Sequence, residues 1–241
     1  MKNLVFYFCG LLLTSCSSST ILLNSLNKTK APLYYLHDTP KKDCDRTTTI
    51  SISEFSNNQL PTTTTVEKIN RKIIPLIFYN YEEVNLGVKL GKSSLNQDYN
   101  NFFKYALNTE SKRTGCFSLT DSVSSADFSL QIKYDTCFAN SKYQMKSTTI
   151  FILLFYGTTY EESGSPAYSK LRFSAELKRG EDVIFTKNYL ADRVQPFISN
   201  NYKDINKLRS DFLVNMAESL SLNTKDCIEL LIQDINDNIN N

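Results

Sequence analysis

Apolar residues alternate with polar ones over several long stretches of this sequence. The alternation is regular over residues 84–90, 127–138 and 168–177. Successive side chains of a β-strand point to opposite faces, so a period of two predicts strands with one buried face. Residues 179–182 are polar, contain a glycine, and separate the last of these stretches from a further strand-like segment over 183–189. This arrangement predicts a β-hairpin.

Other segments predict extended structure from their composition. Residues 47–53 are rich in threonine and isoleucine, which favour strands. Residues 72–79 and 116–119 are also expected to be extended. Pro75 cannot donate a hydrogen bond to a neighbouring strand, so we expect it at a sheet edge or at a bulge.

Two segments have helical spacing of their apolar residues. Ser94 and Gln97 match the capping-box pattern that begins a helix, and this helix is expected to end before Gly115. Ser199 or Asn200 is placed to cap a second amphipathic helix. The apolar positions of the second helix are Tyr202, Ile205, Leu208, Phe212, Leu213, Met216 and Leu220.

Together these elements predict an α+β fold, with a mainly antiparallel sheet packed by two amphipathic helices. A short helix over residues 225–235 and a frayed polar tail over 237–241 are expected to follow. We place a single domain at residues 46–236, and a hydrophobic content of 41% is ample for its core. The formal net charge is +2 without a long basic block, so nucleic acid is not an expected partner.

The N-terminal residues have the proportions of a signal peptide. Lys2 supplies a positive charge, and residues 4–13 form an apolar run of about ten residues. A membrane-spanning helix needs roughly twenty apolar residues, so this run is too short to cross a bilayer. We assign residues 1–15 to a signal peptide and expect an exported protein.

The end of this run resembles the lipobox of bacterial lipoproteins. Leu13, Thr14 and Ser15 precede Cys16 in the lipobox order of an aliphatic residue, two small residues and a cysteine. The resemblance implies acylation of Cys16 and a mature chain that begins there; an ordinary secretory signal with an incidental cysteine is the alternative. Each buried methylene adds about 0.8 kcal/mol, so two or more acyl chains such as palmitate anchor a protein stably. By the sorting rule of enterobacterial lipoproteins, Ser17 in place of aspartate favours the outer membrane.

The residues after the anchor are polar. Residues 17–20 predict a flexible tether, and we expect the folded part to begin near residue 30 or later. Residues 16–45 are accordingly assigned to a lipidated tether and an N-terminal extension.

Four cysteines remain after removal of the signal and acylation: Cys44, Cys116, Cys137 and Cys227. An even number in an oxidising compartment predicts disulfide bonds, and four cysteines allow three pairings. We favour Cys116 with Cys137, because both lie in strand-like segments, and Cys44 with Cys227. Zinc binding is the competing interpretation. None of the four belongs to a Cys-x-x-Cys pair, so we expect no metal site.

Catalytic patterns are weak in this sequence. His37 is the only histidine and lies in a polar segment, so a Ser-His-Asp or Cys-His site is not expected. Residues 87–93 resemble a phosphate-binding loop, but three residues separate the glycines where four are needed. We therefore expect no nucleotide cofactor and assign Gly91 to a turn before the first helix. Solvated turns are the expected places of three acidic pairs: Glu82 with Glu83, Glu161 with Glu162, and Glu181 with Asp182.

The unbroken apolar run over residues 148–156 has two interpretations. A core strand buried on both faces is the favoured one and requires no further function. An exposed ribbon or edge instead binds a partner strand, a lipid or a neighbouring subunit. The candidate partner-binding residues are then Ile150, Phe151, Ile152, Leu153, Leu154, Phe155 and Tyr156.

The order of the predicted elements resembles the small α+β lipoproteins of the Gram-negative envelope. Three short motifs carry the resemblance: residues 73–78 before the first helix, 115–119 after it, and the Ala-Asp-Phe strand start within 126–132. Such proteins assist the export of polysaccharide, lipopolysaccharide or curli, or activate peptidoglycan synthases. The lipobox, the lack of a catalytic constellation and the apolar run over residues 148–156 favour a non-catalytic assembly or transport accessory of this kind, which faces the periplasm from the outer membrane and binds a protein or glycolipid. A carboxylate-based hydrolase of glycans or peptidoglycan and a surface-exposed lipoprotein that contacts a host are the alternatives.

Overall fold

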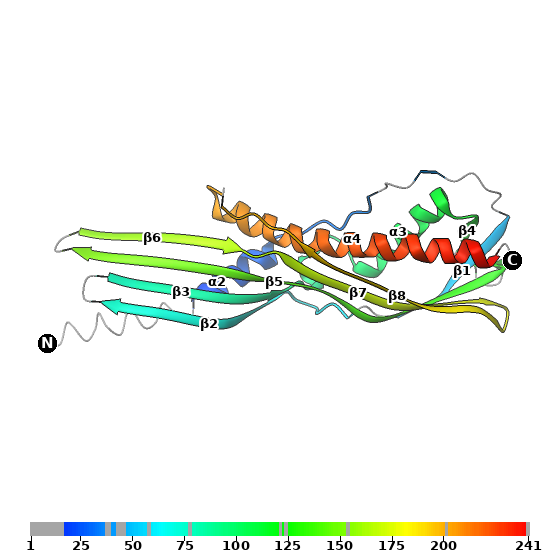
Figure 1. Ribbon diagram of the computed structural model, residues 1–241, viewed down its shortest axis with the longest axis horizontal. Helices are drawn as coiled ribbons and strands as arrows, with labels where there is room; N and C mark the ends of the chain where they lie inside the picture. The colour runs from blue at the N-terminus through cyan, green and yellow to red at the C-terminus, as the bar shows by residue number, and fades with distance from the viewer. Residues whose placement is uncertain are drawn as a thin grey trace.

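The computed structural model describes residues 17–36, 40–41, 47–56, 59–76, 79–120, 122, 125–152, 155–200 and 202–239. Within them, eight strands form one sheet, and three α-helices lie on one of its faces (Figure 1). The strands are β1 (Thr48–Phe55), β2 (Thr65–Leu76), β3 (Tyr79–Lys89), β4 (Phe117–Thr120), β5 (Phe128–Ile152), β6 (Phe155–Gly164), β7 (Ala167–Arg179) and β8 (Asp182–Gln195). The helices are α2 (Ser17–Lys28), α3 (Tyr99–Thr114) and α4 (Ile205–Ile239). The α+β prediction is confirmed, with three helices in place of two.

The longest strand, β5, joins two parts of the sheet. Its first half pairs with β1 in parallel and with β7 in antiparallel orientation. Its second half pairs with β3 and β6, both antiparallel. Because β1 also pairs in parallel with β4, the sheet is mixed, and the prediction of a mainly antiparallel sheet is only partly right.

A bulge lets β5 keep the same face toward the helices along its whole length. The buried apolar side chains are even-numbered as far as Tyr134 and odd-numbered from Cys137 onward. The pairing with β7 shifts between Tyr134 and Thr136, which makes Asp135 the extra residue. Successive side chains alternate between faces, so without this shift Cys137 and the residues beyond it would face away from the helices.

Aromatic rings fill the layer between the sheet and α3. Phe103 of α3 is fully buried, and its ring centroid lies 5.4 Å from that of Phe55 in β1. It also lies 5.7 Å from Tyr134 and 5.2 Å from Phe173, with the ring planes nearly perpendicular in both pairs. These edge-to-face contacts place α3 over the centre of the sheet.

The helix α3 begins later than predicted. Asp98 is its N-cap, and the Asp98 carboxylate accepts hydrogen bonds from the backbone N–H groups of the second and third helical residues. Ser94, the predicted cap, is instead buried in a short 3-10 turn, where it accepts a hydrogen bond from the Thr64 hydroxyl at 2.7 Å. The predicted end before Gly115 is confirmed.

The helix α4 is a single element of 35 residues, about 52 Å long at the usual rise. The prediction of two helices is wrong because the polar residues at the expected break are buried and bonded. Asn223 donates to the Ser169 hydroxyl, and the Thr224 hydroxyl shares a hydrogen bond with Tyr99. The helix continues to Ile239, so the prediction of a frayed tail is wrong for residues 237–239.

The N-terminal ends of α4 and α2 also differ from the predictions. The first turn of α4 is capped by Asp204, whose carboxylate accepts from the Asn206 N–H at 2.8 Å, and not by Ser199 or Asn200. The residues predicted as a flexible tether form the first turn of α2. The prediction that the folded part begins near residue 30 is wrong, because Leu22 and Leu26 on α2 are fully buried in the core.

The described cysteines are free thiols. Cys116, Cys137 and Cys227 are buried and form no disulfide, so the predicted bond between Cys116 and Cys137 is wrong. The reason is topological: Cys116 immediately precedes β4, Cys137 lies in the middle of β5 opposite Leu171, and β1 separates β4 from β5. Cys44, the predicted partner of Cys227, lies outside the described residues, as do Cys16 and the predicted signal peptide.

Candidate functional site

One end of the sheet extends past the helix layer as a four-stranded antiparallel structure, here called the blade. It consists of β2, β3, residues 140–152 of β5, and β6, in the order β2-β3-β5-β6. In Figure 1 these strands run to the left beyond α2, α3 and α4. β2 and β6 form its two edges, so Pro75 lies on an edge strand as predicted.

A row of alternating charges crosses one face of the blade. Lys72, Glu83, Lys146 and Glu161 are neighbours in register on the four strands. Glu83 accepts hydrogen bonds from the Tyr81 hydroxyl at 2.7 Å and from the Gln144 amide at 2.9 Å. The bond from Tyr81 is the main cause that lowers the pKa of the Glu83 carboxyl, and it raises the pKa of the Tyr81 phenol.

Beyond this row the blade carries no charged residue except Glu82, which bonds back to Arg71 at 2.8 Å. The uncharged end of the blade comprises the described residues 73–76, 79–81, 147–152 and 155–160. Its exposed apolar and aromatic side chains are Ile73 (44% of its surface), Ile74 (37%), Ile150 (40%), Tyr156 (68%) and Tyr160 (42%).

The apolar run over residues 148–156 is not buried at the positions whose side chains the structure describes, so the prediction of a core strand buried on both faces is wrong there. The run ends β5 and begins β6, with Phe151 opposite Tyr156 and Ile152 opposite Phe155. It lies past the described helices, and Ile150 and Tyr156 are exposed. The backbones of the candidate residues Phe151, Ile152 and Phe155 belong to the hairpin, and Leu153 and Leu154 lie outside the described residues.

A buried ion pair attaches the blade to α4. Arg209 of α4 donates to Glu162 of β6 through both Nε, at 2.8 Å, and Nη2. The Tyr143 and Tyr160 hydroxyls donate to the same carboxylate at 2.5 Å and 2.6 Å. The side chain of Glu162 is 0% exposed and that of Arg209 is 9% exposed, so the pair is shielded from water.

The three groups that donate to Glu162 all have raised pKa values. The hydrogen bond to Glu162 is the largest cause that raises the pKa of Arg209 above its ordinary value. Burial first, and the bond to Glu162 second, raise the pKa values of the Tyr143 and Tyr160 phenols far above 10. Because these pKa values are raised, Arg209, Tyr143 and Tyr160 stay protonated at physiological pH and keep donating to Glu162, which suits a rigid connection.

The prediction that the acidic pairs lie at solvated turns is wrong for two of the three. Glu82 and Glu83 lie within β3, and Glu161 and Glu162 lie within β6. Sequence reasoning missed the role of Glu162. The available signal was Arg209, a charged residue between apolar positions 208 and 212 on the buried face of a helix, which requires a partner.

A cavity of ≈ 570 Å³ lies beside the joint, between the base of the blade and the segment that leads into α4. Its walls include Lys146, Tyr160 and Glu161 from the blade and Tyr202 and Lys203 from the segment before α4. The lining mixes lysines and carboxylates with two phenols. It therefore suits a polar group of a partner more than an apolar ligand.

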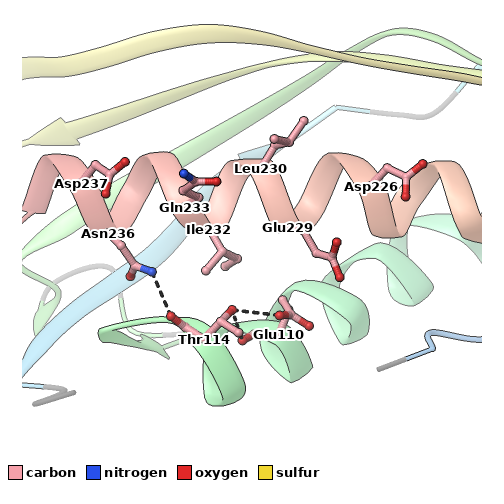
Figure 2. Close-up of a pocket in the computed structure, with 9 residues that line it drawn as sticks. All are labelled: Glu110, Thr114, Asp226, Glu229, Leu230, Ile232, Gln233, Asn236 and Asp237. Carbon is pink, nitrogen blue, oxygen red and sulfur yellow. Dashed lines mark hydrogen bonds between the residues drawn. The ribbon is translucent and has the colours of Figure 1, made fainter. Parts of the chain in front are cut away.

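A second cavity of ≈ 560 Å³ lies between α3 and α4 (Figure 2). Glu110 in its wall is buried and accepts hydrogen bonds from the Tyr35 hydroxyl at 3.0 Å and the Thr114 hydroxyl at 2.8 Å. Asn236 donates to the Thr114 carbonyl and accepts from the Cys116 N–H, so it links the two helices to β4. Through these hydrogen bonds the polar groups that line this cavity have a structural role.

The remaining predictions concern His37, Gly91, metal binding and membrane-spanning helices. His37 lies outside the described residues. Gly91 lies in the turn before α3, where its N–H donates to the Thr64 hydroxyl at 2.9 Å. Within the described ranges, no three histidine, cysteine, aspartate or glutamate side chains gather closely enough to hold a metal ion. No helix among the described residues has both the length and the apolar character needed to cross a membrane.

Comparisons with known proteins assign no family. No family model matches the chain, and no curated protein matches it. Among solved structures, protein XCC0632 from Xanthomonas campestris, described with the family model DUF330, is similar over 87% of this chain and 98% of its own. The identity is 9% and the TM-score is 0.41, so this similarity establishes neither fold family nor function.

Proposed function

We propose that this chain is a lipid-anchored, non-catalytic binding protein of the bacterial cell envelope, and that the blade is its binding surface. The observation that carries the proposal is the exposure of Ile73, Ile74, Ile150 and Tyr156 at the end of a structure that projects past the helix layer. Exposed apolar groups gathered at one place on a protein mark sites of interaction. A protein or a glycolipid of the envelope is the proposed partner class, and the outer membrane facing the periplasm is the proposed location.

The lipobox at residues 13–16 supports the anchor, and α2 gives it a structural consequence. Because α2 begins at Ser17 and buries Leu22 and Leu26, acyl chains on Cys16 would be attached directly to the folded body. The membrane surface would then lie next to the first turn of α2. An anchored protein of this kind has little freedom to reorient.

The joint between Glu162 and Arg209 supports a binding role for the blade. Four hydrogen bonds hold one carboxylate between β6, β5 and α4. A surface that is fixed before binding loses less conformational entropy when it meets a partner. The joint thus favours recognition by a preformed surface.

Site-specific photo-crosslinking in the native envelope tests the proposal. A photoreactive residue in place of Ile73, on the blade, is expected to give a defined adduct with a protein or a lipid of the envelope. The same residue in place of Leu230, an exposed aliphatic position on α4, is the matched control and is expected to give none. Equal labelling at both positions, or no adduct at Ile73, would contradict the proposed binding surface.

The anchor is tested separately by mass spectrometry of the mature chain. We expect an N-terminal peptide that begins at Cys16 and carries acyl groups. A chain that begins elsewhere, or an unmodified Cys16, would contradict the proposed anchoring and the compartment inferred from it.

A further inference from the structure

We infer that the uncharged end of the blade binds the surface of a phospholipid bilayer. The inference rests on the proposed function in taking the blade as a binding surface, and it names what the end of that surface contacts. It concerns residues that precede and follow the hairpin turns, in particular Ile73, Ile74, Ile150 and Tyr156.

The first argument is that the side chains become less polar from the charged row toward the hairpin ends. The charged row of Lys72, Glu83, Lys146 and Glu161 lies at one level. On β5 and β6 hydroxyl side chains follow this row, and apolar residues come last; the threonines and serine concerned are Ser147, Thr148, Thr149, Thr158 and Thr159. On β2 the apolar Ile73 and Ile74 follow Lys72 directly, with Glu82 of β3 opposite Ile73. A decrease in polarity along the strands is the gradient that a water–lipid boundary favours.

The second argument is that apolar residues are exposed on both faces of the blade. Ile73 and Ile74 are consecutive in β2, so they point to opposite faces, and both are exposed. Ile150 and Tyr156 also lie on opposite faces, because Tyr156 pairs with Phe151. A folded protein partner covers one face of a sheet, whereas a bilayer surrounds an inserted end on both. The two-sided exposure therefore favours lipid.

The third argument is the number of tyrosines near the boundary. Tyr79, Tyr81, Tyr156 and Tyr160 all lie within the uncharged end. A tyrosine has an apolar ring and a polar hydroxyl, so it is stable where hydrocarbon meets water, and it is enriched at membrane interfaces. Tyr156 is the most exposed of the described apolar residues of the blade.

The length of the uncharged end and its unpaired backbone groups limit how deeply the blade inserts into a bilayer. From Lys146 to Ile152, six residues further, β5 rises about 20 Å, which is less than the roughly 30 Å of a hydrocarbon core. Among the described strands, none pairs with the outer edge of β2 or of β6, and unpaired backbone groups are unstable in hydrocarbon. The end of the blade therefore lies at the headgroup and upper acyl level and does not cross the bilayer.

A tryptophan reporter tests the inference, because the chain contains no tryptophan. The full chain with Tyr156→Trp is reconstituted into vesicles of phosphatidylcholine and phosphatidylglycerol that carry brominated acyl chains. We expect blue-shifted emission that loses most of its intensity to bromine quenching. Tyr105→Trp, at an exposed position on α3, is the control and is expected to keep its emission.

A second variant separates lipid contact from mere proximity to the vesicle. Ile74→Glu with Ile150→Glu, in the Tyr156→Trp background, places charges on exposed positions of the uncharged end, and we expect it to abolish the quenching. Emission from Tyr156→Trp that matches the Tyr105→Trp control would overturn the inference. If the Ile73 crosslink to a protein persisted in that case, the proposed binding function would stand and its target would be a protein; loss of both would refute both.

Discussion

Replacement of Glu162 by glutamine is expected to destabilise the protein strongly while keeping the shape of the side chain. The Glu162 carboxylate accepts four hydrogen bonds, two from Arg209 and one each from Tyr143 and Tyr160. In Glu162→Gln the Arg209 guanidinium stays buried without a counter-charge. Removal of one partner of a buried ion pair costs about 3–5 kcal/mol. Because glutamine still offers one acceptor oxygen, we expect a loss near the lower end, about 3 kcal/mol.

Urea unfolding followed by circular dichroism measures this loss. With a urea m-value of about 2–3 kcal/mol/M for a domain of this size, the midpoint is expected to fall by about 1 M or more. Glu67→Gln is the matched control, because the Glu67–Lys89 pair on the blade is largely exposed. Exposed pairs contribute about 1 kcal/mol or less, so the control midpoint is expected to move little.

The double variant Glu162→Gln with Arg209→Met tests the cause. If the unpaired guanidinium accounts for the instability, removal of its charge restores more than about 1 kcal/mol relative to Glu162→Gln alone. A double variant as unstable as the sum of the two single variants would refute the argument, as would a Glu162→Gln midpoint equal to that of the Glu67→Gln control.

Two further predictions concern packing and the thiols. Gly91→Ala places a Cβ 2.1 Å from the carbonyl carbon of Thr63, and we expect it to lower the free energy of unfolding in urea by about 1–3 kcal/mol or more. Gly157→Ala is the control: no atom lies within 4 Å of the added Cβ, so its free energy of unfolding is expected to stay within about 0.5 kcal/mol of the original. Equal stability of the two variants would contradict this prediction. Burial raises the pKa of the Cys227 thiol to about 12 and also raises that of Cys137, so neither thiol is expected to react with a maleimide at neutral pH before the chain unfolds. Peptide mapping under non-reducing conditions that found Cys116 linked to Cys137 would disprove the free-thiol assignment.

The parts of the fold with a clear side-chain period were predictable from the sequence. β7 and the first half of β5 have a period of two, and the polar residues 179–182 mark the turn from β7 into β8; the structure has these elements as expected. The single helix α4 was not predictable, because Asn223 and Thr224 look like a break until their partners Ser169 and Tyr99 are known. Those contacts span 54 and 125 residues of sequence, and no local pattern reports them.

The candidate site was predictable only in part. The run over residues 148–156 is apolar throughout, so it shows neither a period of two nor one of 3.6. Whether such a run is a core strand or an exposed hairpin depends on where the helix layer ends, which is a property of the whole fold. The ion pair of Glu162 with Arg209 could not be predicted from a local pattern either, because 47 residues separate the two.

The bulge at Asp135 has a consequence for how this architecture can vary. Deletion of that one residue would leave every side chain of β5 on its present face, because the alternation would then run unbroken from Tyr134 to Met145. What would change is the bend and twist of the strand, since a bulge increases both. Gain or loss of this one bulge residue therefore changes the orientation of the blade relative to the helix-covered part of the sheet without repacking the core.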